Sequence, residues 1–544
     1  MCAAQFLKSD LVIFHYHLFP GGVTNVVTLS IRAILEHLPQ IRRIRLVCGS
    51  ERHLQGIRHH LSNFTPDAEK RVEIEVLPEL FYLRRDARPG DADVPDVVAV
   101  KQLLLSHFGG GYWWVHNFHL GKNPVFTQAL LEIAAEHPEQ TLLFHIHDFP
   151  ECARYDNLTL LGRFVNRPLY PTSENVRYAV INRRDLRLLI SAGVPTERVV
   201  LLDNPVPGDR PAEPDRRGVR ERLERAFADR FSGYRPEAPL LFYPVRTIRR
   251  KNALEAGLFT RLSEEPANLI ITLPGVSEKE APYSSLVHQC YVRGLIPGMS
   301  GIGTELAEAG IGFQELALST DCVVSSSVQE GFGYLFIDGR RWRKAVFARY
   351  LDILDGITEI VDGDGAHFYR ELQVPIDRTQ RAKLLQAYRS RATEIAPSLP
   401  EWARENLLQE IEDAFAGTSV DFSYLGVPDQ LTTLEESDRD EGLRAEIVAL
   451  NRELFDALTR LIHTHPDDID ERIQSHFSLE SFAASLADLL DGFPGPIPPE
   501  SDPPPAGSPP ATVSTPPAGT RDPIHERLLA GFATLEYIRL LYSF

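Results

Sequence analysis

The stretch DLVIFHYHLFPGGVTNVVTLSIRAILEHL, residues 10–38, joins a short apolar run to an amphipathic segment through a Pro-Gly-Gly turn. The apolar run is typical of a buried β-strand, and the glycines after it are typical of a turn. In the last part of the stretch, apolar residues recur at helical spacing: Val27, Ile31, Ile34, Leu35 and Leu38. The stretch therefore predicts a strand, a turn and a helix, the repeating unit of α/β folds.

The same alternation continues through the first two hundred residues. Further strands are predicted at 44–49, 72–77, 112–118, 141–148, 177–182 and 198–205, and helices at 125–137 and 183–194. After the charged segment 215–231 the alternation begins again. Its predicted strands are 239–245, 268–275, 321–327 and 343–350, with a helix at 250–265. Two successive α/β domains with mostly parallel sheets explain this pattern.

The expected domains are a first one at 1–207, a second one at 208–395, a helical region at 396–492, a Pro-rich linker at 493–520 and a tail helix at 521–544. The tail carries an apolar stripe formed by Leu528, Phe532, Leu535, Ile538 and Tyr542. A stripe of this kind should dock on this chain or on a second copy, so a homo-oligomer formed through the tail is one expectation.

Composition excludes several classes of partner. The 544 residues carry a net charge of -18, which argues against nucleic acid, whose phosphates need a basic surface. The 5 cysteines show no CxxC spacing, so a reducing compartment is expected. The start of the chain has no basic leader, and no apolar run approaches the roughly 20 residues that span a bilayer. We therefore expect a cytoplasmic protein without an integral membrane segment.

The turn PGGV contains Gly21 and Gly22, between a predicted strand and a predicted helix. Glycines at such a place let a ligand approach the backbone, and a helix N-terminus attracts anions. Taken alone, the pair is also typical of an ordinary tight turn.

The motif VRTIRRKN places Arg246 and Lys251 between a strand end and a helix start. An Arg fork and a compact Lys charge suit a diphosphate, and the alternative is a solvated basic turn. Four cations at one strand end of an acidic chain favour the functional interpretation.

Histidines gather at two predicted strand ends. The motif FHIHD carries His145 and His147, and WWVHNFH carries His116 and His119. A metal site, a substrate contact and a structural role compete for these side chains. A metal needs further ligands, and no motif such as HExxH supplies them. We therefore expect no metal, and the substrate contact and the structural role stay open.

Four motifs, in this order along the chain, resemble retaining nucleotide-sugar-dependent glycosyltransferases of the GT-B architecture, specifically family 4. They are HYHLFPGGVTNVV, FHIHD, PVRTIRRKN and SSSVQEGFGYLFID, and they span most of residues 10–395. The resemblance implies an α/β fold of two Rossmann-like, doubly wound parallel-sheet domains that face a cleft, followed here by C-terminal helices. It also implies a hinge near residues 204–207.

The resemblance assigns roles to specific residues. It implies that Gly21 and Gly22 approach the donor phosphates, and that Arg246 and Lys251 hold the diphosphate. His147 would contact the donor sugar, and His116 and His119 would lie on the acceptor side. Glu330 would lie by the hydroxyls of the transferred sugar, near the amides of Phe332 and Gly333. Asp338 would bind the ribose, at a position where the family has Glu.

The implied reaction moves a hexose from a nucleotide-diphosphate sugar to a hydroxyl of a small soluble acceptor, with retention and without a metal or cofactor. Two alternatives share the architecture. One is a nucleotide-sugar epimerase or a phosphorylase, and the other is a non-catalytic nucleotide-sugar-binding protein.

Overall fold

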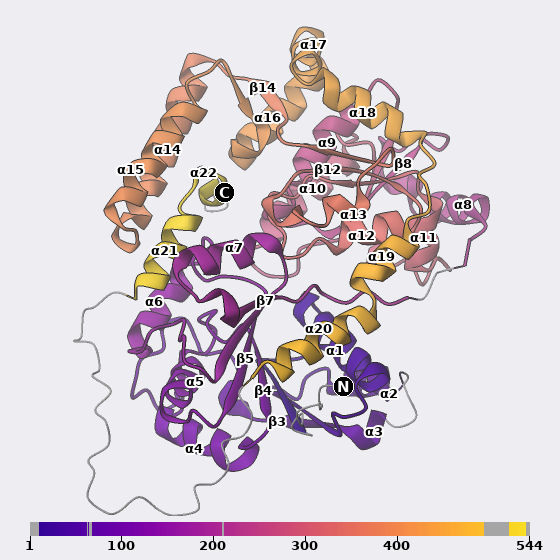
Figure 1. The fold of residues 1–544 in the computed structure, drawn as a ribbon. Coiled ribbons are helices and arrows are strands. Elements are labelled where there is room, and N and C mark those ends of the chain that lie inside the picture. The colour runs from indigo at the N-terminus through magenta and orange to yellow at the C-terminus, as the bar shows by residue number, and fades with distance from the viewer. Residues whose placement is uncertain (1–9, 63, 65–67, 209–211, 494–521, 540–544) are drawn as a thin grey trace, which may run out of the picture. The chain divides into compact units, whose positions relative to one another are not determined.

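The structure is a computed structural model of the 544-residue chain (Figure 1). It describes all residues except 1–9, 63, 65–67, 209–211, 494–521 and 540–544. The chain forms two compact units. Unit 1 comprises residues 1–208, 398–400 and 476–532, and unit 2 comprises residues 209–397, 401–475 and 533–544. Apart from Phe493, the predicted Pro-rich linker lies outside the described residues.

Unit 1 is built on a parallel sheet of seven strands in the order β3-β2-β1-β4-β5-β6-β7. The strands are β1 (Asp10–His15), β2 (Arg43–Cys48), β3 (Val72–Val76), β4 (Tyr112–His116), β5 (Thr141–Ile146), β6 (Val176–Val180) and β7 (Val199–Leu201). The strand order reverses between β1 and β4. Such a reversal makes the loops after the two central strands diverge, and ligands of parallel sheets bind there.

Helices cover both faces of the unit 1 sheet. They are α1 (Gly22–His37), α2 (Leu54–Ser62), α3 (Ala68–Arg71), α4 (Val97–Phe108), α5 (Pro124–Glu136), α6 (Tyr155–Phe164), α7 (Arg183–Ala192), α20 (Leu479–Asp491) and α21 (Pro523–Phe532). Leu11 and Ile13 of β1 share a buried cluster with residues of α1 and α20, which lie side by side (Figure 1). Phe14 points the other way and meets Phe108 of α4, with ring centroids 5.3 Å apart. Burial on both faces explains why β1 is a continuous apolar run from Leu11 to Phe14.

Unit 2 repeats the arrangement with a parallel sheet of six strands in the order β10-β9-β8-β11-β12-β13. The strands are β8 (Leu240–Arg246), β9 (Asn268–Leu273), β10 (Gly298–Ser300), β11 (Cys322–Ser325), β12 (Ala345–Arg349) and β13 (Ala366–Tyr369). The order reverses between β8 and β11. Two parallel sheets with surrounding helices confirm the predicted α/β fold class.

The helices of unit 2 are α8 (Arg216–Phe227), α9 (Ala253–Leu262), α10 (Ala281–Val292), α11 (Phe313–Ser319), α12 (Tyr334–Arg341), α13 (Thr358–Val361), α14 (Arg378–Ile395), α15 (Glu401–Ala414), α16 (Val427–Arg439), α17 (Glu441–Leu450), α18 (Arg452–Ile462) and α22 (Leu535–Ile538). Helix α12 lies close to the sheet, because a Cβ atom at Gly339 would be 3.0 Å from Cγ2 of Val346. A short antiparallel pair, β14 (Gln373–Pro375) with β15 (Ser419–Asp421), adds a separate ribbon.

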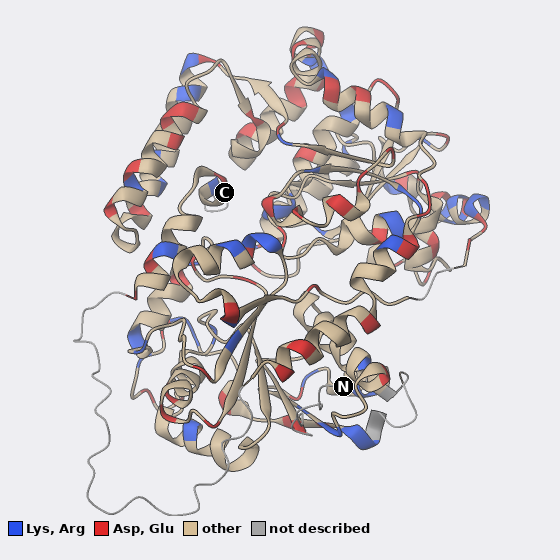
Figure 2. Ribbon diagram, in the orientation of Figure 1, with Lys and Arg blue, Asp and Glu red and all other residues tan. Residues whose placement is uncertain are grey.

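The predicted helical region of residues 396–492 does not form a unit of its own. Helices α15 to α18 belong to unit 2, α20 belongs to unit 1, and α19 (Asp470–Phe477) begins in unit 2 and ends in unit 1. The apolar stripe of α20 explains its place, since Leu486 and Leu490 are fully buried in the cluster with α1. The charged residues of α14 are mostly cations, and those of α15 are mostly carboxylates (Figure 2).

The tail, expected as one helix, contains two described helices, α21 and α22. They belong to different units, with the break at Ala533 and Thr534. Four stripe residues are at most 5 % exposed: Leu528, Phe532, Leu535 and Ile538. Tyr542 lies outside the described residues. Because this chain itself buries the stripe, the predicted homo-oligomer stays a prediction.

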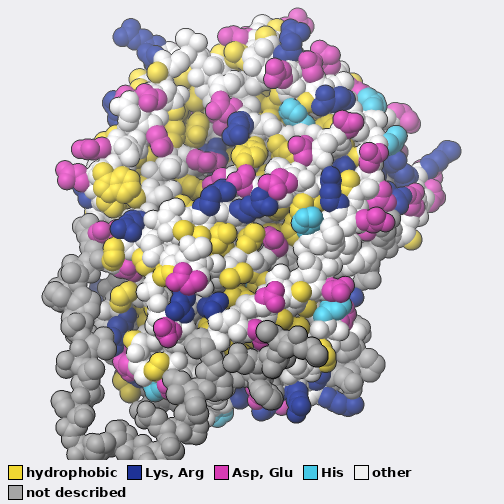
Figure 3. All heavy atoms as spheres, in the orientation of Figure 1, with side chains coloured by type: hydrophobic (Ala, Val, Ile, Leu, Met, Phe, Trp, Pro, Cys, Tyr) yellow, Lys and Arg dark blue, Asp and Glu magenta, His cyan; other side chains and the backbone are white. Residues whose placement is uncertain are grey.

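Charges of both signs are interspersed over the face shown in Figure 3, without a continuous basic patch. Cys48, Cys152, Cys290 and Cys322 are buried free thiols. Among the described residues, no helix is both long enough and apolar enough to cross a membrane.

Truncating Phe532 should destabilise the protein, because its fully buried ring packs 5.2 Å from Phe149 in unit 1. We expect Phe532→Ala to lower the free energy of unfolding by about 3–5 kcal/mol, as for other buried Phe side chains. Urea denaturation measures the change. Phe313→Ala, at a ring that is 46 % exposed, is the matched control and should cost clearly less. Equal losses in the two variants would contradict the docking of α21.

Candidate active site

An ion pair between Lys251 and Glu330 joins two loops of unit 2 at the strand-order reversal. Lys251 follows β8, and Glu330 follows β11, 79 residues later in the chain. The ammonium donates to Oε1 of Glu330, and both side chains are largely buried, at 11 % and 16 % exposed. Arg250 adds a second cation, with Nη1 3.4 Å from Oε2 of Glu330. The predicted donor-side residues Lys251 and Glu330 are therefore in direct contact.

Backbone groups hold the two loops together around this pair. The amide of Val328 donates to the carbonyl of Arg250 at 2.9 Å, and Nη1 of Arg250 donates to the carbonyl of Gln329 at 2.9 Å. The Tyr243 hydroxyl donates to the carbonyl of Lys251 at 2.8 Å. Such contacts fix the geometry of Lys251 and Glu330 before a ligand arrives.

The charges of the pair follow from their surroundings. Burial alone would raise the pKa of Glu330, but Lys251 and Arg250 outweigh it and hold that pKa below its usual value. Burial lowers the pKa of Lys251 to about 8, against the attraction of Glu330. Both groups are therefore charged at pH 7.

Arg246, the last residue of β8, is exposed at the same edge of the sheet. Its charge lies near enough to Lys251 to help to lower the pKa of the lysine. Within the described part of the chain, no ion pair within 4 Å involves Arg246, although its charge helps to lower the pKa of Glu280.

The start of α12 lies close to the ion pair of Glu330 in the sequence, four residues after Glu330. Gly333 is its N-cap with φ of 110°, a conformation that favours glycine, and no side chain caps the helix. Phe332 is buried beside it, at 4 % exposed. Asp338 lies further along α12, with its carboxylate 3.8 Å from Arg341. Burial raises the pKa of Asp338 to about 6, while Arg341 opposes the shift, so the group is mostly ionised at pH 7.

In unit 1, Gly21 and Gly22 lie where predicted, between β1 and α1. Both are exposed, and Gly22 is the first residue of the helix, which has no side-chain cap. A Cβ atom at Gly22 would meet nothing within 4 Å. The described part of the protein leaves the space beside Gly22 empty. An anionic ligand could therefore reach the amides at the start of the helix.

His116, His145 and His147 form a buried cluster at the carboxyl ends of β4 and β5. Nδ1 of His116 lies 2.8 Å from Nε2 of His147, and the three side chains offer nitrogens within 4.8 Å of one another. Burial lowers the pKa of all three, in the case of His147 to about 3, so they are neutral at pH 7. Neutral imidazoles can bind a sugar hydroxyl or a metal ion. The motif FHIHD supplies only two histidines, and the fold brings His116 to them as a third potential metal ligand.

Two further histidines of unit 1, His119 and His15, are also buried. His119 is fully buried between the rings of Phe149 and Tyr170, and burial lowers its pKa to about 3. This position favours a packing role, and its predicted acceptor-side role stays a prediction. His15, the last residue of β1, lies 6.1 Å from His116 between ring centroids. His15 was not predicted as a site residue, although it ends a strand just before the Gly-Gly motif.

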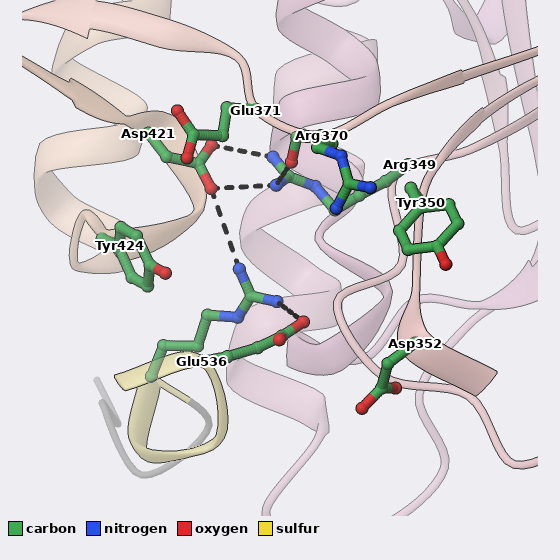
Figure 4. Close-up of a pocket in the computed structure, with 9 residues that line it drawn as sticks. Arg349, Tyr350, Asp352, Arg370, Glu371, Asp421, Tyr424 and Glu536 are labelled. Carbon is green, nitrogen blue, oxygen red and sulfur yellow. Dashed lines mark hydrogen bonds and ion pairs between the residues drawn. The ribbon is translucent and has the colours of Figure 1, made fainter. Parts of the chain in front are cut away.

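A cavity of about 220 Å³ lies at the ends of β12 and β13 in unit 2 (Figure 4). Its lining residues are Arg349, Tyr350, Asp352, Arg370, Glu371, Asp421, Tyr424, Glu536 and Arg539. Fully buried Arg349 binds both Asp421, at 2.8 Å, and Glu255, at 2.6 Å. The tail residue Arg539 lies 3.7 Å from Asp421. Because these groups satisfy one another, the network anchors the tail of unit 2.

Comparisons with known proteins add an independent finding. No family model matches the chain. The mannosylglucosyl-3-phosphoglycerate synthase of Petrotoga mobilis is 31% identical over 552 residues, which cover 98% of this chain and 100% of that protein.

Among solved structures, HepE of Anabaena in complex with UDP and glucose is 13% identical, with 88% of this chain and 99% of that chain covered and a TM-score of 0.48. WaaG, a glycosyltransferase involved in lipopolysaccharide biosynthesis, is 10% identical, with 88% and 99% covered and a TM-score of 0.43.

Removing Lys251 should leave the Glu330 carboxylate without its main counter-ion. We expect Lys251→Met to lower the free energy of unfolding by up to about 3 kcal/mol, because a largely buried charge loses its partner. Adding Glu330→Gln to this variant should recover part of the loss. Urea denaturation of the wild type, both single variants and the double variant measures the coupling.

A matched control for this cycle is Lys383→Met. Lys383 is 59 % exposed and pairs with Asp429 at 2.9 Å, so its loss should cost less than about 1 kcal/mol. Strictly additive effects of the Lys251 and Glu330 substitutions would show that the two side chains do not stabilise each other.

Proposed function

Because the chain belongs to the family of the mannosylglucosyl-3-phosphoglycerate synthase of Petrotoga mobilis, we propose that it transfers a hexose from a nucleotide-diphosphate sugar to an acceptor hydroxyl. The product named for that relative is a glucosyl-3-phosphoglycerate that carries a mannosyl group. The proposed donor is thus a nucleotide-diphosphate mannose, and the proposed acceptor is glucosyl-3-phosphoglycerate. Identity over nearly the whole of both chains supports the extension to this protein.

The observation that carries the proposal is the group of cations held against Glu330 at the strand-order reversal of unit 2. Breaking a sugar–diphosphate bond builds negative charge on the leaving phosphate. Arg246 and Lys251 supply fixed positive charge for it, and the uncapped amides at the start of α12 supply further donors. Groups that are oriented before the reaction stabilise such a charge without reorganisation.

We propose that Glu330 binds the transferred sugar. Its carboxylate is ionised and held by Lys251 and Arg250, so its remaining acceptor capacity points in a fixed direction. In the proposed mechanism it accepts hydrogen bonds from the sugar hydroxyls, and Asp338 accepts them from the ribose. The sugar contact expected of His147, a neutral imidazole of unit 1, stays a prediction.

The proposed reaction retains the anomeric configuration. The acceptor hydroxyl attacks the anomeric carbon on the face that the phosphate leaves, and the departing phosphate oxygen takes the proton of the hydroxyl. A double displacement would need a carboxylate nucleophile on the opposite face. We assign no residue to that role, because Glu330 is already engaged with Lys251 and Arg250.

A transfer assay tests this function. The full chain is incubated with glucosyl-3-phosphoglycerate and mannose or glucose donors of UDP, GDP and ADP, and the products are identified by mass spectrometry and NMR. We expect one hexose to be added with an unchanged anomeric configuration. Glu330→Ala should lower the rate at least about a hundredfold, since oriented groups at the reacting centre contribute this much. Absence of transfer from every donor would refute the proposed activity, and a fully active variant would refute the role of Glu330.

A second test concerns metal. The proposed reaction needs no metal ion, because Arg246, Arg250 and Lys251 supply the positive charge at the diphosphate. Dialysis against EDTA should therefore leave the rate of transfer unchanged, with elemental analysis of the dialysed protein as the control. Activity that EDTA removes and zinc restores would contradict metal independence. It would point to His116, His145 and His147, whose nitrogens lie within 4.8 Å of one another.

A further inference from the structure

Lys122 is a half-buried cation of unit 1 without a counter-ion. It lies in the loop between β4 and α5, and among the described residues no carboxylate pairs with it. Burial lowers its pKa, and the nearby cations Arg154 and Arg85 lower it further. Taking a charge partly out of water without a partner costs free energy, which a bound anion would offset. The two neighbouring arginines already have partners, Asp148 and Asp156.

The ammonium group lies over the face of one aromatic ring, which itself packs against other rings. Nζ of Lys122 lies 5.3 Å from the centroid of the Tyr82 ring, which is 37 % exposed. The His17 ring lies 5.0 Å from Tyr82 and stacks on Phe19 at 4.3 Å. Partly exposed aromatic faces beside a few fixed polar groups are typical of small-molecule sites, and they suit the apolar face of a sugar ring.

The hydrogen bonds of His17 leave the Tyr82 hydroxyl free to donate. The backbone amide of Phe19 donates to Nδ1 of His17 at 3.3 Å, so in the neutral imidazole Nε2 carries the proton. Burial lowers the pKa of His17, which keeps the ring neutral at pH 7. Nε2 therefore donates to Oη of Tyr82 at 3.0 Å. The hydroxyl hydrogen of Tyr82 remains for an acceptor outside this pair, and the Lys122 ammonium lies over the face of the same ring.

The buried side chain of Asn123 holds this group in place. Its Nδ2 donates to the carbonyl of Glu79 at 2.7 Å and to that of Phe81 at 2.8 Å. The amide of Leu83 donates to the carbonyl of Lys122 at 2.9 Å. The segment that carries Tyr82 is thus tied to the loop that carries Lys122. A donor pair in a fixed position binds a ligand with less loss of conformational entropy.

The position of the group in the fold is also that of a ligand site. His17 follows β1 and Lys122 follows β4, the two strands between which the order reverses. Phe19 comes directly before the Pro-Gly-Gly turn that begins α1.

We propose that Lys122 and Tyr82 bind the anionic phosphoglycerate end of the acceptor, with the rings of His17, Phe19 and Tyr82 against its sugar. This inference rests on the proposed function for the identity of the acceptor. The inference assigns acceptor specificity to unit 1. The sequence motifs of the donor site lie in unit 2 and carry no information about the acceptor. Phosphate and carboxylate share the chemistry that the ammonium and hydroxyl donors recognise.

The test compares Lys122→Met with Lys122→Arg and the control Lys70→Met, which makes the same charge change at an exposed residue of α3. In the transfer assay, Lys122→Met should raise the KM for glucosyl-3-phosphoglycerate about ten- to a hundredfold, as the loss of a charged hydrogen bond implies. The KM for the donor should stay within about threefold. With the neutral acceptor glucosylglycerol, the variant and the wild type should have equal KM values. Glucosylglycerate, which has the carboxylate but no phosphate, shows which of the two anionic groups Lys122 binds.

A binding measurement without the donor tests the subsite independently of turnover. 3-Phosphoglycerate should raise the melting temperature of the wild type and of Lys70→Met, but not that of Lys122→Met. Lys122→Arg, which keeps the charge, should keep most of this stabilisation. The subsite would be overturned if 3-phosphoglycerate stabilised Lys122→Met as much as the wild type, or if it did not stabilise the wild type. It would also be overturned if Lys122→Arg lost as much of the stabilisation as Lys122→Met.

The two proposals fail in different ways. If 3-phosphoglycerate stabilises the chain through Lys122 but no donor supports transfer, the subsite stands and the proposed activity falls. If transfer occurs and Lys122→Met leaves the acceptor KM unchanged, the activity stands and the subsite falls.

Discussion

The reversal of strand order in each parallel sheet is the constraint on which the rest of the structure depends. Between β1 and β4, and between β8 and β11, the following loops run in opposite directions and leave the strand ends uncovered. Gly21, Gly22 and Lys122 lie at the first of these places, and Arg246, Lys251 and Glu330 lie at the second. The apolar strands, buried on both faces, fix the backbone there and leave the chemistry to the loops.

The two sheet edges differ in electrostatic character because burial acts differently on their side chains. In unit 1 no carboxylate among the described residues pairs with His116, His145 or His147, and burial keeps these histidines neutral. In unit 2 burial is offset by pairing, so Lys251 and Glu330 stay charged. Neutral donors and acceptors suit sugar hydroxyls, whereas fixed charges suit a diphosphate. The division matches the proposed roles of the two units.

Periodicity and apolar runs predicted most of the two sheets, because buried parallel strands are continuous apolar segments. They did not predict β10 (Gly298–Ser300), since three residues without an apolar run carry no such pattern. The motif resemblance selected Lys251 and Glu330, but their ion pair joins residues 79 positions apart and depends on tertiary structure. Tyr82 was missed for the same reason, because hydrogen bonds of Asn123 and of the Leu83 amide bring its segment to the loop after β4.

Because the chain is acidic as a whole, cations without an ion-pair partner are the groups best suited to bind anionic ligands. A net charge of -18 repels anions over the surface as a whole, so binding of a nucleotide diphosphate or a phosphoglycerate must depend on local groups. Most basic side chains at the two sheet edges have carboxylate partners, as Lys251, Arg154 and Arg349 do. Within the described part of the chain, Arg246 and Lys122 have none, and each lies beside a strand-order reversal. An ion pair with a ligand is the interaction that the fold leaves open at both positions. Donor and acceptor anions would complete the electrostatics of the two units separately.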